Sequence, residues 1–453
     1  MAGRSGEQKF LDEMYKRDGN QLVVLYGRKN IGIDELLKQF CKDKKCVYYF
    51  ARQASEKEQR KMFGDEIEQK FNVKLPDDSY DTFFKRIRSG DASKLVLVID
   101  EFQRIIKKDP DFMNSIIKLK SKKLYPGPVF IILVSSSIAW VEQNLEKNIG
   151  NVMKKVNEIY KVKEIKFVDL VQSFQNYTVS ECVQVYGVIG GVPGFIKRWD
   201  SSKDIKYNIC THILSKEGFL YDEAESFIQD ELRELSVYNT ILAAIASGKR
   251  KLNDLFQYTG YSRAKISVYL KNLMEFEVVE KVYSFETGGW ENSQKGLYQI
   301  KNTYINFWFK FVYPHLSELN IMEPEEYYEK YIAQELEQYL NRYFQKVCTE
   351  YLELMSLVNR LPLKIHKTGT WVGKQGNIDI IAQNSIRENL IGLCNWSEDQ
   401  MTIKMYEQLQ ESMKKAKIKA KYYYLFSAKS FDATLKKLSE ENNHIVLIDM
   451  NRL

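Results

Sequence analysis

The chain has 453 residues, which exceeds the usual size of one domain, so two to four domains are expected. Hydrophobic residues make up 44% of it and aromatic residues 13%, a composition that builds cores and excludes a disordered chain. The formal charge is only +7, which permits a nucleic-acid partner without requiring one. Residues 1–20 lack the apolar core of a signal peptide and no apolar run approaches membrane-spanning length, so we expect a cytoplasmic protein without a membrane partner.

The first half of the chain alternates apolar runs with helical segments, which is the pattern of a parallel sheet with helices on both faces. Continuous apolar runs predict strands that are buried on both faces, at residues 22–26, 47–50, 95–99 and 129–134. Helices are expected between them, for example at 34–42 and 55–71. These elements predict an α/β domain over residues 1–225.

The middle of the chain, residues 226–315, predicts an α-rich winged-helix domain. The spacing of apolar residues predicts a long helix over 230–247, followed by two shorter helices over 251–258 and 262–276. Ser262 is the expected N-cap of the last of these helices. Two β-like runs, 278–283 and 296–300, would form the wing.

Residues 316–453 predict a small C-terminal α/β domain that opens with a long helical region over 325–357. A further helix is expected at 401–416. Strand-like runs follow the long helical region at 363–366, 377–382, 390–393, 422–426 and 445–448.

The loop between the first strand and its helix has the glycine spacing of a P-loop. The candidate nucleotide-binding residues are Gly27, Arg28, Lys29, Asn30, Ile31, Gly32, Ile33 and Asp34. In a working P-loop, a Lys and then a Ser or Thr follow the second glycine and contact phosphate and Mg²⁺. Here Ile33 and Asp34 hold those places. A carboxylate about 4 Å from a phosphate charge costs up to about 4 kcal/mol at an effective dielectric of 20, so we expect weak ATP binding and weaker hydrolysis.

The glycines alone would also suit a plain turn between strand and helix, but two further strand ends carry polar residues. Asp100 and Glu101 follow the third strand, an arrangement in which Asp100 would hold Mg²⁺ and Glu101 would activate a water molecule. Ser136 follows the fourth strand, where a polar side chain could sense a γ-phosphate or only cap the next helix. Glu101 and Ser136 are therefore the candidate catalytic residues.

The chain resembles the archaeal-type P-loop ATPases, a family close to the AAA and STAND groups. The resemblance runs from the loop segment through the winged helix to the C-terminus, and it rests on LVVLYGRKNIG, VYYFARQASEKE, LVLVIDEFQ, FIILVSSS, YGVIGGVPGFIKRWD and YQIKNTYINFWFKFV. It implies binding of ATP by the loop, of Mg²⁺ by Asp100 and Glu101, and a turn beside the nucleotide that contains Pro193. The chain departs from the family at Ile33 and Asp34, so ATPase activity stays open.

The C-terminal domain of such proteins resembles restriction-endonuclease-like nucleases of the PD-(D/E)XK kind, in which several carboxylates and a lysine hold a metal. Asp379 matches the first carboxylate. Leu393 and Asn395 stand where the resemblance implies a Glu and a Lys, and Gln345 replaces a further helical acid. One carboxylate cannot assemble such a site, so we expect a binding or docking module in which Asp379 is a cap or turn residue.

Basic residues on the winged helix suggest a double-stranded DNA partner. Arg263, Lys265 and Lys271 lie on or near the expected recognition helix, where they would contact phosphates or simply form a solvated face. Lysines between 414 and 421 precede a strand and suit a soluble edge. Three functions stay open: a nucleotide-dependent switch with weak or no hydrolysis, a DNA-binding regulator with a vestigial nucleotide site, and a scaffold for an unknown protein partner.

Overall fold

The computed structural model describes residues 3–87, 93–285, 296–373 and 376–453. The chain divides into two compact units. Unit 1 comprises Met1–Ile165 with Val192–Phe195, and unit 2 comprises Lys166–Gly191 with Ile196–Leu453. The limits at 225 and 315 that the sequence suggested stay predictions. No helix among the described residues is long and apolar enough to cross a membrane.

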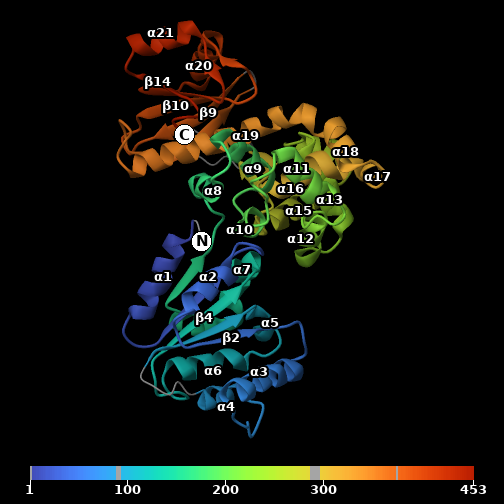
Figure 1. The fold of residues 1–453 in the computed structure, drawn as a ribbon, viewed down its shortest axis with the longest axis vertical. Helices are drawn as coiled ribbons and strands as arrows, with labels where there is room; N and C mark the ends of the chain where they lie inside the picture. Colours follow the sequence, from blue (N-terminus) through green and yellow to red (C-terminus); the bar gives the residue numbers. More distant parts are fainter. Residues whose placement is uncertain (1–2, 88–92, 286–295, 374–375) are drawn as a thin grey trace. The chain divides into compact units, whose positions relative to one another are not determined.

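Unit 1 is built on a five-stranded parallel sheet with the strand order β2-β3-β4-β1-β5 (Figure 1). The runs expected at 22–26, 95–99 and 129–134 form its three inner strands, which confirms the predicted α/β class. The sheet also contains β5, a short polar edge strand whose composition carries no apolar signal. The strands are β1 Gln21–Tyr26, β2 Cys46–Phe50, β3 Leu95–Asp100, β4 Val129–Ser135 and β5 Glu158–Lys161.

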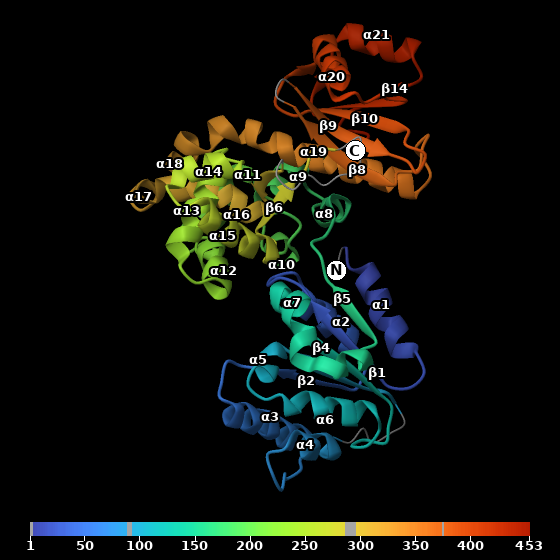
Figure 2. The ribbon, with the colours of Figure 1, turned by 180° about the vertical axis from the view of Figure 1, so that it is seen from behind.

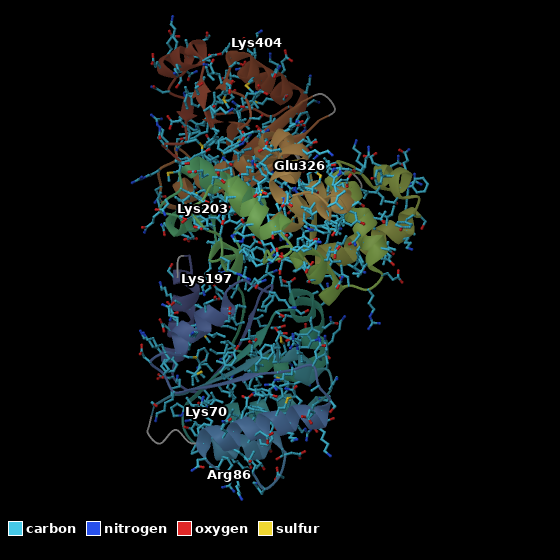
Figure 3. All side chains as sticks on the ribbon, turned by 45° about the vertical axis from the view of Figure 1, so that its right-hand side comes forward. Lys70, Arg86, Lys197, Lys203, Glu326 and Lys404 are labelled. Carbon is cyan, nitrogen blue, oxygen red and sulfur yellow. The ribbon has the colours of Figure 1, made fainter. Side chains whose placement is uncertain are left out.

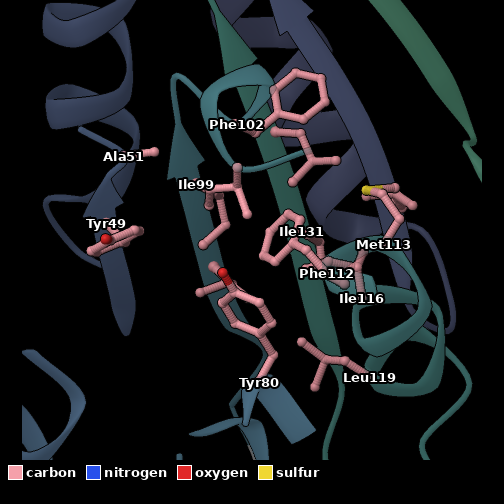
Figure 4. Packing of buried hydrophobic residues seen from close by; sticks show 14 of the residues in the cluster. Tyr49, Ala51, Tyr80, Ile99, Phe102, Phe112, Met113, Ile116, Leu119 and Ile131 are labelled. Carbon is pink, nitrogen blue, oxygen red and sulfur yellow. The ribbon is translucent and has the colours of Figure 1, made fainter. Parts of the chain in front are cut away.

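Helices cover both faces of this sheet. α1 and α2 pack on one face, where their apolar residues meet alternate residues of β1, β3 and β4. Helices α3 to α7 pack on the other face, in the larger core drawn in Figure 4. The helices are α1 Ser5–Lys16, α2 Ile33–Cys41, α3 Glu56–Phe71, α4 Tyr80–Arg86, α5 Gln103–Ile106, α6 Asp111–Lys120, α7 Ile138–Ile149 and the 3-10 turn Gly150–Lys155.

The expectation that residues 47–50 are buried on both faces was wrong. β2 lies at the edge of the sheet, and only Val47 and Tyr49 face the larger core. Tyr48 and Phe50 point to the other face and are 40% and 44% exposed. The reason is that the core formed by α1 and α2 reaches β2 at Cys46 but includes neither Tyr48 nor Phe50.

The middle of unit 2 contains the expected winged helix. Three helices pack on one another and on an antiparallel pair of strands. The single helix expected over 230–247 was wrong, because Leu232 is extended and the left-handed Glu234, with φ 58°, ends the helical path. Ser262 caps its helix as predicted by accepting from the Lys265 amide. The elements are α13 Leu235–Ala246, α14 Leu252–Thr259, α15 Arg263–Glu275, β6 Val279–Val282 and β7 Leu297–Ile300, and the helix α12 Glu223–Glu231 precedes them.

Further helices flank the winged helix in unit 2. Among them, α9 packs closely on α19, since a side chain at Gly187 would meet Leu340. The long helical region expected over 325–357 is divided at Ile332. These helices are α8 Phe167–Ser173, α9 Val179–Ile189, α11 Ile205–Ile209, the π-helix Cys210–Leu214, α16 Thr303–Phe307, the π-helix Trp308–Val312, the 3-10 turn Tyr313–His315, α17 Leu316–Leu319, α18 Pro324–Tyr331 and α19 Ala333–Leu357. The short helix α10 Pro193–Ile196 lies almost entirely in the segment that belongs to unit 1.

The C-terminal part of unit 2 is a mixed five-stranded sheet with the order β14-β12-β10-β9-β8 (Figure 2). α20 packs into its core on one face, while Tyr351 of α19 meets Phe426 on the other. The strand expected at 363–366 was wrong, because that stretch is irregular, with the Ile365 amide donating to the Ser356 hydroxyl at 2.9 Å, and the edge strand starts at Lys367. The elements are β8 Lys367–Val372, β9 Asn377–Gln383, β10 Asn389–Asn395, β11 Gln400–Met401, α20 Ile403–Ala416, β12 Tyr422–Ser427, β13 Ser430–Phe431, α21 Ala433–Glu441 and β14 Ile445–Ile448.

Candidate functional site

The loop between β1 and α2 has a conformation that requires its glycines. Gly32 is left-handed, with φ 85°, and it precedes the first residue of α2. A side chain at Gly27 would place its Cβ only 2.7 Å from the Val162 carbonyl oxygen, closer than real contacts allow. Asn30 is also left-handed, with φ 63°. The backbone is therefore that of a glycine-dependent loop at a helix N-terminus, the kind of place where backbone amides can face an anion.

The side chain of Arg4 holds the loop from the side of α1. This guanidinium is 3% exposed and donates to the Ile31 carbonyl at 2.5 Å and to the Lys163 carbonyl at 2.7 Å. It also pairs with Glu7 at 2.8 Å. The sequence analysis missed Arg4, since nothing in its polar surroundings marks it as a loop partner.

The segment Val192–Phe195 contacts the same loop within unit 1. The Gly194 amide donates to the Asn30 carbonyl at 2.9 Å, and a Cβ at Gly194 would come within 2.9 Å of Asn30. This contact brings the predicted Pro193 turn beside the loop. Arg28 pairs with Glu164 at 2.6 Å, and its guanidinium carbon lies 5.9 Å from the centre of the Phe195 ring. A carboxylate thus already neutralises the Arg28 cation.

The two exchanged residues at the start of α2 point in different directions. Ile33 is 7% exposed and belongs to the core between α2 and the sheet. Asp34 is exposed in the first turn of the helix. Lys29 is also exposed, on the solvent side of the loop. The loop thus has the apolar side chain of Ile33 where a working P-loop has its lysine. It has the carboxylate of Asp34 where a working P-loop has the hydroxyl of a Ser or Thr.

Asp100 lies at the carboxyl end of β3, beside an exposed tyrosine. One carboxylate oxygen of Asp100 accepts from the Glu101 amide at 2.9 Å, and the other accepts from the Tyr48 hydroxyl. Burial raises the pKa of Asp100. Burial and the hydrogen bond to Asp100 also raise the pKa of Tyr48, and the nearby charges of Asp34 and Glu101 add to this effect. The edge of the sheet where phosphates would bind is therefore rich in negative charge.

Glu101 is engaged on both carboxylate oxygens. One oxygen accepts from the Ser136 amide at 3.2 Å, and the other accepts from Gln103 Nε2 at 2.8 Å and pairs with Arg104 at 3.2 Å. The residue is 7% exposed and is left-handed, with φ 54°. In this arrangement Glu101 ties the end of β3 to the end of β4. Ser136 meets it through its backbone amide.

These residues do not fit Mg-ATP in the way a working P-loop does. The glycine backbone suits a phosphate, but Ile33 supplies no cation, Asp34 adds a negative charge, and the carboxylate of Glu101 is already held by neighbouring protein groups. Among the residues that the structure describes, no group of three His, Cys, Asp or Glu side chains is placed to hold a metal ion.

Comparison with known proteins agrees with this fold. Residues 2–198 match a model of an ATPase domain found predominantly in Archaea. They belong to that family of archaeal ATPase domains. Downstream of the ATPase domain, residues 308–416 match a family of archaeal and bacterial proteins of unknown function.

Individual proteins that are similar to this chain share little sequence identity with it. An uncharacterized protein of Methanocaldococcus jannaschii is 27% identical over 99% of this chain and 98% of its own length. The Walker-type ATPase of Pyrococcus abyssi is 16% identical, with 68% of this chain and 96% of that one covered at a TM-score of 0.48. The ORC2 protein of Aeropyrum pernix is 13% identical, with 70% and 93% covered at a TM-score of 0.44.

Beyond the ATPase domain, the residues expected to form a degraded nuclease site have structural partners. Asp379 lies inside β9 and accepts from the Cys394 amide of β10 at 2.9 Å, so it joins two strands where we expected a cap or turn. Burial raises its pKa to about 6. Gln345 donates to the Asp379 carbonyl. Asn395 exchanges two hydrogen bonds with the Glu398 backbone, at 3.0 and 3.1 Å, and so shapes the turn after β10.

The predicted nucleic-acid residues all lie on α15, and all three are exposed. The Arg263 guanidinium carbon lies 4.1 Å from the centre of the Phe256 ring, and the Lys265 ammonium lies 4.8 Å from the centre of the Tyr261 ring. Lys271 pairs with Glu275 at 3.8 Å. Two of the three cations are thus held against aromatic rings of the same winged helix.

Proposed function

We propose that this protein is a non-hydrolysing member of its ATPase family, in which the nucleotide site is vestigial and binds Mg-ATP weakly. The proposal rests on the contacts that the carboxylate of Glu101 makes with neighbouring protein groups. A residue that activates water must direct a carboxylate oxygen toward that water. Glu101 is instead held by the Ser136 amide, by Gln103 and by its ion pair with Arg104, which direct both of its oxygens toward protein groups.

The charges around the loop support the same proposal. Transfer of a phosphoryl group depends on cations that stabilise the phosphate oxygens. Arg28 is paired with Glu164, and Ile33 lies in the core. Asp34 and Asp100 add negative charge on the side where the phosphates would bind.

Phosphate release and calorimetry test this proposal. We expect purified protein with Mg-ATP to release no more phosphate than the Asp100→Ala variant, and to bind Mg-ATP with a dissociation constant of about a millimolar or weaker. Micromolar binding that Asp100→Ala abolishes, together with phosphate release above that variant, would refute the vestigial site.

A double substitution tests which side chains are responsible. Ile33→Lys with Asp34→Thr restores the cation and the hydroxyl of a working loop, and we expect it to bind Mg-ATP at least about tenfold more tightly than the wild type. Asp34→Asn alone, which removes only the repulsion, is the matched control and should give a smaller gain. Circular dichroism checks that a lysine at the buried position leaves the fold intact. A folded double variant with no gain would mean that the loop shape also fails.

A second candidate function is the binding of double-stranded DNA by α15. Its outward residues Ala264, Ser267, Val268 and Lys271 follow the spacing of one helical face, and all four are exposed. Val268 alone is 57% exposed. A face of small side chains with a lysine at its edge suits the major groove, which admits a helix.

Anisotropy with a labelled DNA duplex tests this candidate. We expect Lys271→Ala to weaken binding and to reduce the slope of log K against log salt by about 0.9. Lys437→Ala is the matched control, because Lys437 has a comparable exposed pairing with Glu441 at 3.9 Å on α21. Equal slopes of log K against log salt for the two variants would show that Lys271 on α15 does not contact the DNA.

A further inference from the structure

A basic hollow lies at the end of α20 in the C-terminal part of unit 2. Its volume is about 620 Å³. That volume falls in the range of ligand-binding sites. Its lining residues come from α20, from the turn after it and from the start of β12, and they are Gln410, Met413, Lys414, Lys417, Ile418, Lys419, Ala420 and Tyr423.

The hollow combines a ring of positive charge with an apolar floor. Lys414, Lys417 and Lys419 are exposed, while Met413 and Ile418 are buried beneath them. Within the part of the chain that the structure describes, no carboxylate forms an ion pair with any of these three lysines. Lys421, just outside the hollow, differs in pairing with Glu388 at 2.5 Å.

The backbone that carries these lysines is fixed by hydrogen bonds. Lys417 is left-handed, with φ 57°, and ends α20. The Ile418 amide then donates to the Met413 carbonyl at 3.0 Å, and the side chain of Asn389 in β10 donates to the Lys419 carbonyl at 2.9 Å. The lysines therefore extend from a defined turn, which lowers the ordering cost of binding a charged ligand.

An aromatic ring forms one wall of the hollow. Tyr423 is partly exposed at the second position of β12, and its ring packs against that of Tyr406 with centroids 5.2 Å apart. Tyr406 is buried, so it holds the Tyr423 ring in place. A fixed ring beside lysines is the combination that binds unpaired nucleic-acid bases by stacking while cations meet the phosphates.

We propose that this hollow binds a single-stranded polynucleotide. An unpaired base enters the hollow against Tyr423 and the apolar floor, and Lys414, Lys417 and Lys419 contact the flanking phosphates. The bases of a duplex are stacked and paired and cannot enter, so the duplex is disfavoured. Between residues 410 and 423 five lysines outnumber the one acid, Glu411, and this excess of positive charge favours a ligand that carries several phosphates.

Fluorescence anisotropy of the full chain with a labelled oligothymidylate tests whether the three lysines of the hollow contribute to binding. The variant combines Lys414→Ala, Lys417→Gly and Lys419→Ala, with glycine chosen because position 417 is left-handed. We expect at least about a tenfold loss of affinity and a fall of about 2 in the slope of log K against log salt, from about 0.7 per phosphate contact.

The control variant removes the same charge elsewhere in the same sheet domain. Lys404, labelled in Figure 3, lies on the first turn of α20, about 15 Å along the helix from Lys414. Lys404→Ala with Lys436→Ala and Lys437→Ala should bind oligothymidylate as the wild type does. Equal losses in the two triple variants would overturn the proposal, since net charge alone would explain binding.

Two substitutions of Tyr423 test whether a base stacks on its aromatic ring. Tyr423→Leu should weaken oligothymidylate binding about 5- to 150-fold, while Tyr423→Phe should retain it because the stacking ring remains. The proposal is overturned if Tyr423→Leu binds like Tyr423→Phe, if poly-glutamate displaces the oligonucleotide as well as excess oligothymidylate does, or if a duplex of equal length binds the hollow more tightly.

Discussion

Replacing Arg4 by Met should destabilise the loop that follows β1 far more than the same replacement of an exposed arginine near α1 would. The guanidinium is almost fully buried and meets two backbone carbonyls and the Glu7 carboxylate. Removing one partner from a buried ion pair costs about 3–5 kcal/mol, because the remaining charge and acceptors stay desolvated. Arg17→Met is the matched control, since Arg17 and Glu158 are 3.7 Å apart and about half exposed. Such a surface pair contributes about 0–1 kcal/mol.

Hydrogen exchange measured by mass spectrometry reports on the loop directly, without requiring two-state unfolding of a chain with two units. Peptides that span β1, the loop and α2 should exchange at least about a hundredfold faster in Arg4→Met than in the wild type. Adding Glu7→Gln should recover part of this loss, because it removes the unpaired charge. Similar exchange in Arg4→Met and Arg17→Met would refute the view that Arg4 holds the loop.

Two further substitutions follow from the packing and the charges. Folding raises the pKa of Asp379 from 3.8 to about 6. Its burial therefore has no charge penalty while the carboxyl group is protonated, but above pH 6 its ionisation lowers the free energy of unfolding by about 3 kcal/mol. Thermal melts of Asp379→Asn should therefore exceed those of the wild type at pH 8 and match them below pH 4, whereas a pH-independent difference would contradict the titration. Gly194→Ala should lower the melting temperature, because its Cβ would lie 2.9 Å from Asn30, while Gly6→Ala in α1 has open space and should raise it slightly; equal shifts would disprove the close contact.

The strands of unit 1 show why part of the fold was predictable. β1, β3 and β4 are covered by helices on both faces, so their apolar runs are continuous and easily recognised. β5 and β8 lie at sheet edges, where half-exposed residues leave little apolar pattern. The break at Glu234 was missed because a left-handed residue there has no glycine to mark it.

The candidate site was predictable only where a motif carried it. The spacing of Gly27 and Gly32 located the loop and identified Ile33 and Asp34 as exchanged residues. The contacts that decide its chemistry join residues far apart in the sequence, such as Tyr48 with Asp100 and Arg28 with Glu164. Such pairs leave no local signal in a single sequence. The lysines at 414–421 were visible, but the hollow among them depends on the turn that ends α20.

The discontinuity of unit 1 limits how this protein can be cut or recombined. A fragment that stops at Ile165 would contain all five strands of the first sheet, yet it would lack Val192–Phe195 and the Gly194 amide that binds Asn30. Expression of unit 1 alone therefore needs a later endpoint or a linker that restores this segment. The same connectivity means that evolution cannot exchange the ATPase fold at a single crossover point without also carrying residues 166–191.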